Sequence, residues 1–319
     1  MDRDIVVIGS AVYDITGRFL REGVNAADSN PSRIYTSCGG VGRNIAENAA
    51  RMGLSASLIT AWGTDAFSVE LRASCENMGV DVSRAYSSQG SKTSVYIDLL
   101  DSRGELVLAA SDLAALEALP AGVFSESFEY INRHRLVCLD ANLTEEQLGT
   151  IVAGCVRPIM GDTVSTAKAP RFRPVLGNIH TLKTNAAELG ALTDRDTGSR
   201  PNIEKAAGEL LAAGVKRVFV TLGERGACCA ERQGAVWIDG FPARVTSVTG
   251  VGDAFAAGSA YGILRGMSAV DTLLFGTAMS HITLQSPSAV SGKMTEDRAM
   301  SLFAKYKREF DERKTLIEL

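Results

Sequence analysis

Near its C-terminus the chain carries two glycines and an acid whose spacing has a clear chemical meaning. Gly250 and Gly252 flank Val251, and Asp253 follows them at the start of a run of small residues that predicts a helix. Glycines allow backbone N–H groups to point into one concavity. The N-terminus of the helix adds partial positive charge to that concavity, which therefore suits an anion such as a phosphate.

The carboxylate of Asp253 is poorly explained as a ligand of that phosphate, because the two negative groups repel each other. It is better explained as a base that takes a proton from an attacking hydroxyl group. Phosphoryl transfer to an alcohol is therefore the first hypothesis. The alternative that this segment leaves open is an ordinary junction between a loop and a helix, in which Asp253 only favours the helix dipole.

A second glycine-rich segment, residues 39–44, separates a predicted strand from a predicted helix. A dinucleotide fingerprint would need a glycine where Ile45 stands, and the residue order of a Walker A loop is absent. The Asn44 amide instead offers a donor and an acceptor that suit vicinal sugar hydroxyls. Asp14 follows the first predicted strand, at the mouth where open α/β sheets bind ligands, and could accept two hydroxyl hydrogen bonds. The alternative for the glycine-rich segment is a helix start that Asn44 caps. The alternative for Asp14 is a solvated position in a turn.

Two further segments suit a nucleotide and its metal ion. Asn185 and Glu188 lie three residues apart, on one face of a predicted helix, where they could orient the waters of a hydrated Mg²⁺ toward phosphates. A capping box that only starts the helix is the alternative. Gly223 and Gly226 belong to a turn that begins at Thr221 and could pass over a nucleotide. A plain hairpin turn explains these glycines equally well.

Apolar runs predict the elements that position these segments. Strands and helices alternate along most of the chain, which is typical of a parallel sheet with crossover helices. Residues 11–38 are expected to be polar and irregular apart from a strand at 33–37, and residues 93–100 and 105–110 predict a hairpin. These parts, near 11–38 and 92–110, would form a small β lid on one domain that spans 1–319. The alternating strands are expected at 5–9, 58–61, 136–139, 156–161, 180–183 and 217–222, with two more at 227–231 and 235–238. The helices are expected at 44–52, 66–78, 144–153, 185–191, 203–213, 252–265, 269–283 and 296–312.

Composition limits the class of protein. The 319 residues are 45% hydrophobic, which is ample for a large core, and the net charge of −4 argues against a nucleic-acid or membrane-surface partner. The N-terminal apolar run is too short for a signal peptide or a membrane span. Six cysteines without zinc-type spacing predict free thiols and a cytoplasmic protein, and three scattered histidines argue against a histidine-based metal site.

The order of the segments resembles the ribokinase-like (PfkB) carbohydrate kinase family along essentially the whole chain. The resemblance implies an α/β fold with a mostly parallel central sheet flanked by helices and a small β-sheet lid. It also implies ATP and Mg²⁺ as cofactors and a homodimer formed through the lid. The implied roles are a base (Asp253), an anion hole (Gly250, Val251, Gly252), a sugar site (Asp14, Gly40, Asn44), a magnesium site (Asn185, Glu188) and an ATP site (Thr221, Gly223, Gly226, Asn185).

A narrower likeness, to the pseudouridine kinases of that family, lies in residues 25–34, 39–48 and 162–168. It implies phosphorylation of the 5′-hydroxyl of a nucleoside, pseudouridine, and adds Asn25, Asp28 and Lys168 as candidates on the substrate side. The alternatives are a kinase for another sugar or nucleoside, such as ribose, fructose or adenosine, and a nucleoside-binding sensor that lacks catalysis.

The chain departs from the family pattern at two places. Ser247 and Val248 stand where the family commonly has Asp-Thr, and in relatives that use a monovalent cation that acid is near the ion. A monovalent-cation requirement is therefore in doubt. Val251 replaces the usual alanine of the anion hole, where only its backbone N–H is needed.

Overall fold

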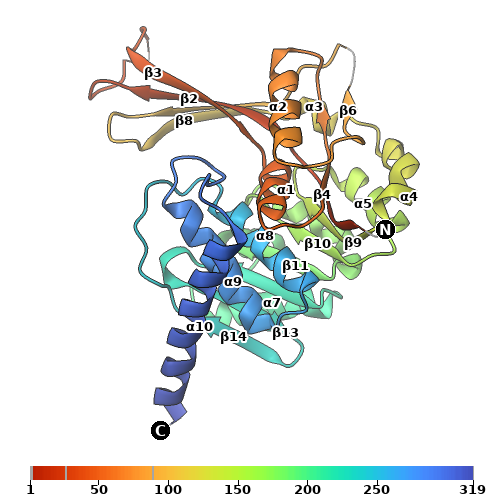
Figure 1. Ribbon diagram of the computed structural model, residues 1–319, viewed down its shortest axis with the longest axis vertical. Helices are drawn as coiled ribbons and strands as arrows, with labels where there is room; N and C mark the ends of the chain where they lie inside the picture. The colour runs from red at the N-terminus through yellow and green to blue at the C-terminus, as the bar shows by residue number, and fades with distance from the viewer. Residues whose placement is uncertain (1–2, 26, 88–89, 319) are drawn as a thin grey trace.

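A computed structural model describes residues 3–25, 27–87 and 90–318, and its centre is one large sheet (Figure 1). In this described part of the chain the sheet has eight strands, of which six are parallel and the last two, β13 and β14, are antiparallel. Their order across the sheet is β14 (Gly234–Ile238), β13 (Ala227–Glu231), β12 (Arg217–Thr221), β11 (Thr181–Asn185), β10 (Ile159–Asp162), β9 (His134–Asp140), β1 (Arg3–Ile8) and β4 (Ala56–Ile59).

Helices cover both faces of this sheet, because its central strands are apolar on both sides. All four residues from Ile5 to Ile8 are fully buried, which is typical of a parallel strand between two helical layers. One face is covered by α1 (Val41–Arg51), α2 (Ala66–Asn77), α8 (Val251–Leu264), α9 (Ala269–Leu284) and α10 (Glu296–Glu318). The other is covered by α3 (Ala114–Glu117), α4 (Phe128–Ile131), α5 (Glu145–Gly154), α6 (Ala186–Thr193), α7 (Arg200–Ala212) and the 3₁₀ segments η1 (Ala121–Ser127) and η2 (Ala169–Asn178).

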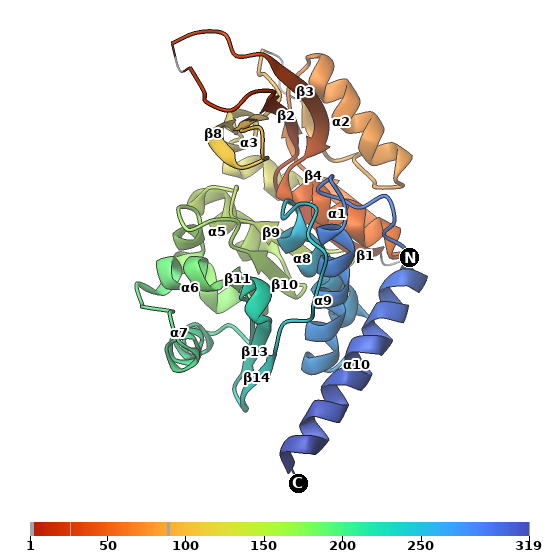
Figure 2. The ribbon, with the colours of Figure 1, turned by 90° about the vertical axis from the view of Figure 1, so that its left-hand side faces the viewer.

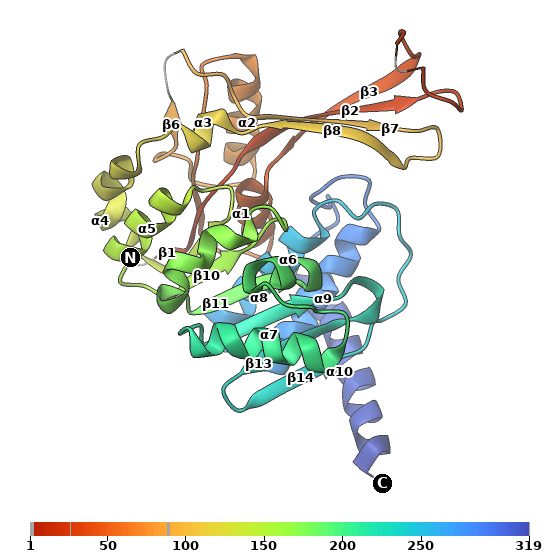
Figure 3. The same ribbon diagram turned by 180° about the vertical axis from the view of Figure 1, so that it is seen from behind.

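The lid is a separate sheet that projects beyond the helical layers, as Figures 2 and 3 show. Its strands lie in the order β3 (Ser32–Gly39), β2 (Val12–Phe19), β7 (Val95–Leu100) and β8 (Leu106–Asp112). The expectation that residues 12–19 would be irregular was wrong. They form a strand because β3 and β7 pair with them from both sides, and such long-range pairing outweighs weak local propensity.

Most other predicted elements agree with the structure to within a few residues. The strand predicted at 156–161 begins only at Ile159, since Pro158 precedes it and Val156 is largely exposed. The pattern did not predict the short helical pieces between residues 114 and 131 or η2. It also did not predict the two-residue pairing of β5 (Ala61–Trp62) with β6 (Tyr86–Ser87).

Helix α8 lies close to α9 because both have small residues where they cross. A Cβ added to Gly258 would lie 2.8 Å from the Cα of Gly276, so neither backbone could approach the other if side chains were present there. This close packing fixes the helix that begins at the predicted anion hole. In the part of the chain that the structure describes, no helix has the length and apolar composition required for a membrane crossing. The six cysteines are free thiols.

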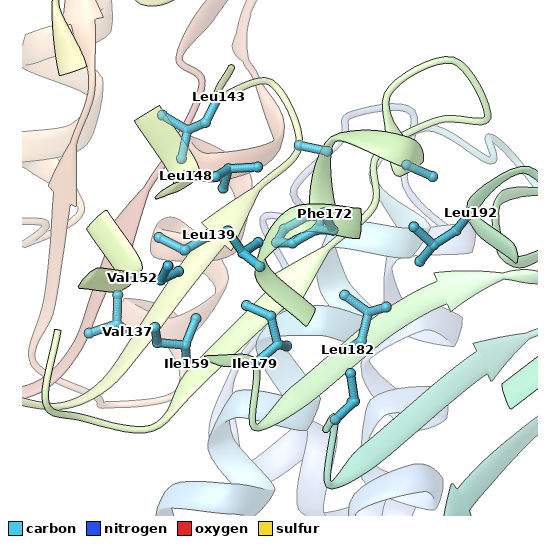
Figure 4. Close-up of a cluster of buried hydrophobic side chains, with 14 of the residues drawn as sticks. Val137, Leu139, Leu143, Leu148, Val152, Ile159, Phe172, Ile179, Leu182 and Leu192 are labelled. Carbon is cyan, nitrogen blue, oxygen red and sulfur yellow. The ribbon is translucent and has the colours of Figure 1, made fainter. Parts of the chain in front are cut away.

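The core between the sheet and α5, η2 and α6 predicts a large effect for one residue (Figure 4). Phe172 is fully buried, and a Cβ on Gly161 of β10 would lie 2.9 Å from its ring. Phe172→Ala should lower the free energy of unfolding by about 3–5 kcal/mol, measured by urea denaturation. Val69→Ala, at an exposed position of α2, is the control and should change it by about 0.5 kcal/mol or less. Equal stability of the two variants would contradict this account of the core.

Candidate functional site

The carboxyl ends of the parallel strands meet the start of α8 around one cavity of about 510 Å³. This is the edge at which open α/β sheets bind ligands. The cavity is lined by residues from β10, β11, α6, the turn after β12 and α8. Of the residues singled out in the sequence, those that line it are Asn185, Glu188, Thr221, Gly223, Gly252 and Asp253.

Helix α8 starts at Val251 without a side-chain cap, and Gly250 precedes it in the left-handed conformation with φ 75°. A Cβ on Gly250 would overlap the backbone carbonyl of Ala289, so only glycine fits this position. The first N–H groups of a helix have no partner within the helix. The start of α8 therefore has the features of an anion-binding site, as the sequence suggests.

Asp253, in the first turn of α8, is a half-buried acid whose pKa lies far from its ordinary value. Burial, together with the nearby Asp162, raises its pKa to about 7, although a hydrogen bond from Asn44 and the charge of Lys183 act in the opposite direction. An acid with a pKa near the working pH suits general-base catalysis.

Asn44, in the first turn of α1, donates from Nδ2 to Asp253 Oδ2 at 2.8 Å. The guanidinium of Arg43 donates to the other end of the Asn44 amide, Oδ1, at 3.1 Å and forms an ion pair with Glu47. Because a guanidinium can only donate, it determines that the NH₂ group of Asn44 faces Asp253. The sugar-side segment and the predicted base are thus in direct contact.

Asp14 comes to the same region from the lid strand β2. Its carboxylate lies against Gly39, so a Cβ at that position would overlap the carboxylate. Burial is the main cause that raises the pKa of Asp14 to about 7, with further contributions from Asp98 and Asp253. The next glycine, Gly40, has a φ of 93°. A Cβ on Gly40 would lie 2.7 Å from the carbonyl of Ser10, so this glycine permits the close approach of two segments.

Asn185 and Glu188 form the capping box that the sequence left as an alternative. Asn185 Oδ1 accepts from the Glu188 N–H at 2.9 Å, and Glu188 Oε2 accepts from the Asn185 N–H at 3.1 Å. Thr163 also donates to the Glu188 carboxylate. Both residues of the box line the cavity, so starting the helix and facing a ligand are compatible. Among the described residues, no three acids, histidines or cysteines are grouped to hold a metal ion by themselves.

The turn after β12 passes beside the cavity through Thr221 and Gly223. Gly223 begins the 3₁₀ turn η3 (Gly223–Arg225) with φ 61°. Gly226 does not line the cavity, and a Cβ there would overlap the carbonyl of Ile238. The glycine at 226 is therefore explained by the turn itself.

The three weaker substrate candidates lie in two different places. Lys168 donates from Nζ to Asn142 Oδ1 at 2.6 Å, and Asn142 donates to Ser10 Oγ at 2.9 Å. This chain of contacts links Lys168 to the segment that precedes β2. Asn25 and Asp28 instead lie exposed in the loop between β2 and β3, where their backbone carbonyls accept from Asn30. The structure does not bring them to Asp253.

Three charged residues in or near the site were not predicted as functional: Lys183 and Asp162, which line the cavity, and Asp140. Lys183 on β11 lies 3.0 Å from Asp162 Oδ2 on β10, and the two side chains are only 7% and 1% exposed. Asp140, at the end of β9, is likewise buried and accepts from the N–H of Ser10 at 2.8 Å. The sequence does contain a signal that could have identified them, because each is a charged residue inside or at the end of an otherwise apolar strand.

Comparison with known proteins agrees with this geometry. The sequence pattern of the pfkB family carbohydrate kinases matches residues 2–296. The pseudouridine kinase of Escherichia coli (strain K12) is 34% identical over 282 residues, which are 88% of this chain and 90% of that relative. A carbohydrate kinase from Agrobacterium tumefaciens is 27% identical, with a TM-score of 0.82 over 95% of this chain and 97% of the other. An Arabidopsis thaliana ribokinase complexed with ribose and ATP is 22% identical, with a TM-score of 0.83 over 95% of this chain and 99% of the ribokinase chain. The predicted ribokinase-like α/β fold with a β lid is confirmed.

The contact between Asn44 and Asp253 predicts a measurable titration. A hydrogen bond donated to a carboxylate favours its charged form, so Asn44→Ala should raise the pKa of Asp253 above its value of about 7. The measurement is a pH titration of the aspartate carboxyl carbons by ¹³C NMR, with the Asp253 signal assigned from its absence in Asp253→Asn. Asn202→Ala, on α7, is the control. An unchanged or lowered midpoint in Asn44→Ala would show that the contact is not formed in solution.

Proposed function

Since the chain belongs to the pfkB family of carbohydrate kinases, we propose that it transfers the γ-phosphoryl group of ATP to the 5′-hydroxyl of pseudouridine. Its membership of this family makes it a phosphotransferase that acts on an alcohol group of a sugar or nucleoside. The similarity to the pseudouridine kinase of E. coli supports the narrower substrate. The observation that carries the proposal is the half-buried Asp253 at the start of α8, in contact with Asn44.

In the proposed reaction, Asp253 accepts the proton of the 5′-hydroxyl as its oxygen attacks the γ-phosphorus. The bond from that phosphorus to the bridging oxygen of ATP breaks, and ADP leaves with the electron pair. The N–H groups at Gly250, Val251 and Gly252 would face the negative charge of the transferred group and stabilise it, with the Val251 N–H exchanging its long 3.4 Å contact with the Val248 carbonyl for that charge. Nothing is oxidised or reduced.

Asp14, Gly40 and Asn44 would hold the ribose. Asp14 supplies acceptors for hydroxyl groups, Gly40 lets its backbone pack against residues 10–12 beside them, and Asn44 supplies a donor that already reaches Asp253. The sugar would therefore sit within hydrogen-bond reach of the base. Closure of the lid over it would exclude water, which otherwise competes as the acceptor of the phosphoryl group.

Asn185 and Glu188 would hold Mg²⁺ through its waters. Their oxygens suit this hard cation, and because the described residues lack a cage of three acids, waters and phosphates would complete its shell. The ion would neutralise charge on the phosphates of ATP. Thr221, Gly223 and the turn closed by Gly226 would lie along the nucleotide.

Lys168 is the substrate-side candidate that the structure supports best, through its link to Asn142 and Ser10. A polar group there could read the edge of the base. Asn25 and Asp28 could reach the substrate only if the lid loop moved toward the site. For this reason they are secondary candidates.

The alternatives remain a kinase for ribose, fructose or adenosine and a nucleoside sensor without catalysis. Asp253 and an intact anion hole argue against the sensor. A homodimer through the lid stays a prediction, which the exposed apolar side chains of Ile34, Tyr35, Leu106 and Leu108 support.

Asp253→Asn tests the base. The variant should keep its fold and its affinity for ATP but lose about 10²–10⁴ in kcat, because the amide cannot accept the proton. The measurement is steady-state ADP release with the nucleoside and ATP varied separately. Asp297→Asn, at an exposed position on α10, is the control and should retain wild-type kcat. Near wild-type turnover by Asp253→Asn would reject the assignment.

The substrate is tested by a coupled ADP-release screen of pseudouridine, uridine, adenosine, fructose and ribose. Uridine lacks the extra ring N–H of pseudouridine, so a buried partner of that group would be left unpaired with uridine. We expect kcat/KM for pseudouridine at least about tenfold above that for uridine. Equal efficiency on both, or better turnover of adenosine, fructose or ribose, would reject pseudouridine and leave the broader kinase activity standing.

A further inference from the structure

We propose that Lys183 is a catalytic residue whose ammonium contacts the transferred phosphoryl group at the start of α8. The proposal rests on the phosphoryl transfer inferred above and adds a cation to the anion hole formed by backbone N–H groups. It concerns a residue on β11, a different element from the helix that carries Asp253.

The position of Lys183 is fixed by two neighbours. Its Nζ lies 3.0 Å from Asp162 Oδ2, on the adjacent strand. A Cβ added to Gly252 would lie 2.9 Å from the same Nζ, so the ammonium is held against the first turn of α8. Lys183, Gly252 and Asp253 all line the cavity. Glycine at 252 thus makes room for the lysine.

The charge of Lys183 is maintained in this buried place. Asp162 Oδ2, 3.0 Å from Nζ, supplies the opposite charge that a buried ammonium requires. A fixed cation in a water-poor site stabilises developing negative charge more strongly than it would in water.

The contacts of Lys183 leave part of its bonding capacity unused. An ammonium has three N–H donors, and within the described part of the chain Asp162 is the only acid within 4.0 Å of Nζ. Asp162 itself is anchored by its other oxygen, Oδ1, which accepts from the Val164 N–H at 2.9 Å. Asp162 thus positions the ammonium, and the remaining donors can serve a phosphoryl oxygen.

A competing explanation is that Lys183 only neutralises Asp162. The two explanations differ in what happens when both charges are removed. If neutralisation is the whole role, Lys183→Met combined with Asp162→Asn should recover activity, because the pair no longer carries a charge. If Lys183 binds the phosphoryl group, the double variant should fold like the wild type and remain slow.

The first experiment measures kcat and KM of Lys183→Met, of the double variant and of Lys216→Met, an exposed lysine that serves as control. The substrate is whichever compound of the screen the wild type phosphorylates best. We expect both Lys183 variants to lose about 10²–10³ in kcat, the usual effect of removing one donor from an oxyanion site, with the KM of the sugar or nucleoside changed less than threefold. Wild-type kcat in Lys183→Met, or recovery in the double variant, would overturn the proposal.

The second experiment does not depend on turnover or on the substrate. Calorimetric titration with ADP, Mg²⁺ and aluminium fluoride, which imitates the transferred phosphoryl group, is compared with titration by ADP and Mg²⁺ alone. We expect the gain in affinity from aluminium fluoride to be at least tenfold smaller in Lys183→Met and in the double variant than in the wild type and Lys216→Met. An equal gain in all four would overturn the proposal. A wild type that phosphorylates no compound of the screen would instead refute the proposed function, and this titration would still test Lys183.

Discussion

The burial of several charges at one edge of the sheet is the constraint on which the rest of the structure depends. Asp253 and Asp162 lie near each other where water is scarce, and one lysine, Lys183, balances them. Separated charges of this kind persist only if their surroundings hold them in place. Two features hold the start of α8 in place. Small residues let α8 pack closely on α9, and Gly250 packs against the backbone of Ala289.

This arrangement has a thermodynamic consequence at neutral pH. The pKa values of Asp14 and Asp253 in the folded protein, about 7, lie above their ordinary value of 3.8. Their contribution to stability is therefore complete below pH 4 and is lost as the pH rises through about 7. The charged form that a base requires is the form that the fold disfavours. Such opposition between stability and activity is common at sites with strongly perturbed acids.

How much of this could be predicted from the sequence depends on the range of the interactions. The glycine that precedes α8 and the capping box at Asn185 depend on residues close together in the chain, so their types and spacing were sufficient to predict them. Strand β2 was missed because two distant strands support it. The pairing of Lys183 with Asp162 was missed because it follows from the register of β10 against β11, which no local pattern reveals.

The way in which the lid joins the body has a consequence for the order of binding and closure. Residues 9–11 separate β1 from β2, and β3 ends at Gly39, just before α1 begins at Val41. The other two lid strands join the body at the same end of the lid, since Val95 at the start of β7 pairs with Tyr13 and with Asp112 at the end of β8. The lid would therefore pivot beside Asp14 and Asn44, the groups proposed to bind the sugar. Points near a pivot move least. A sugar held by the residues proposed above would thus meet them in the open form, and the distant loop between β2 and β3 would travel farthest and arrive last.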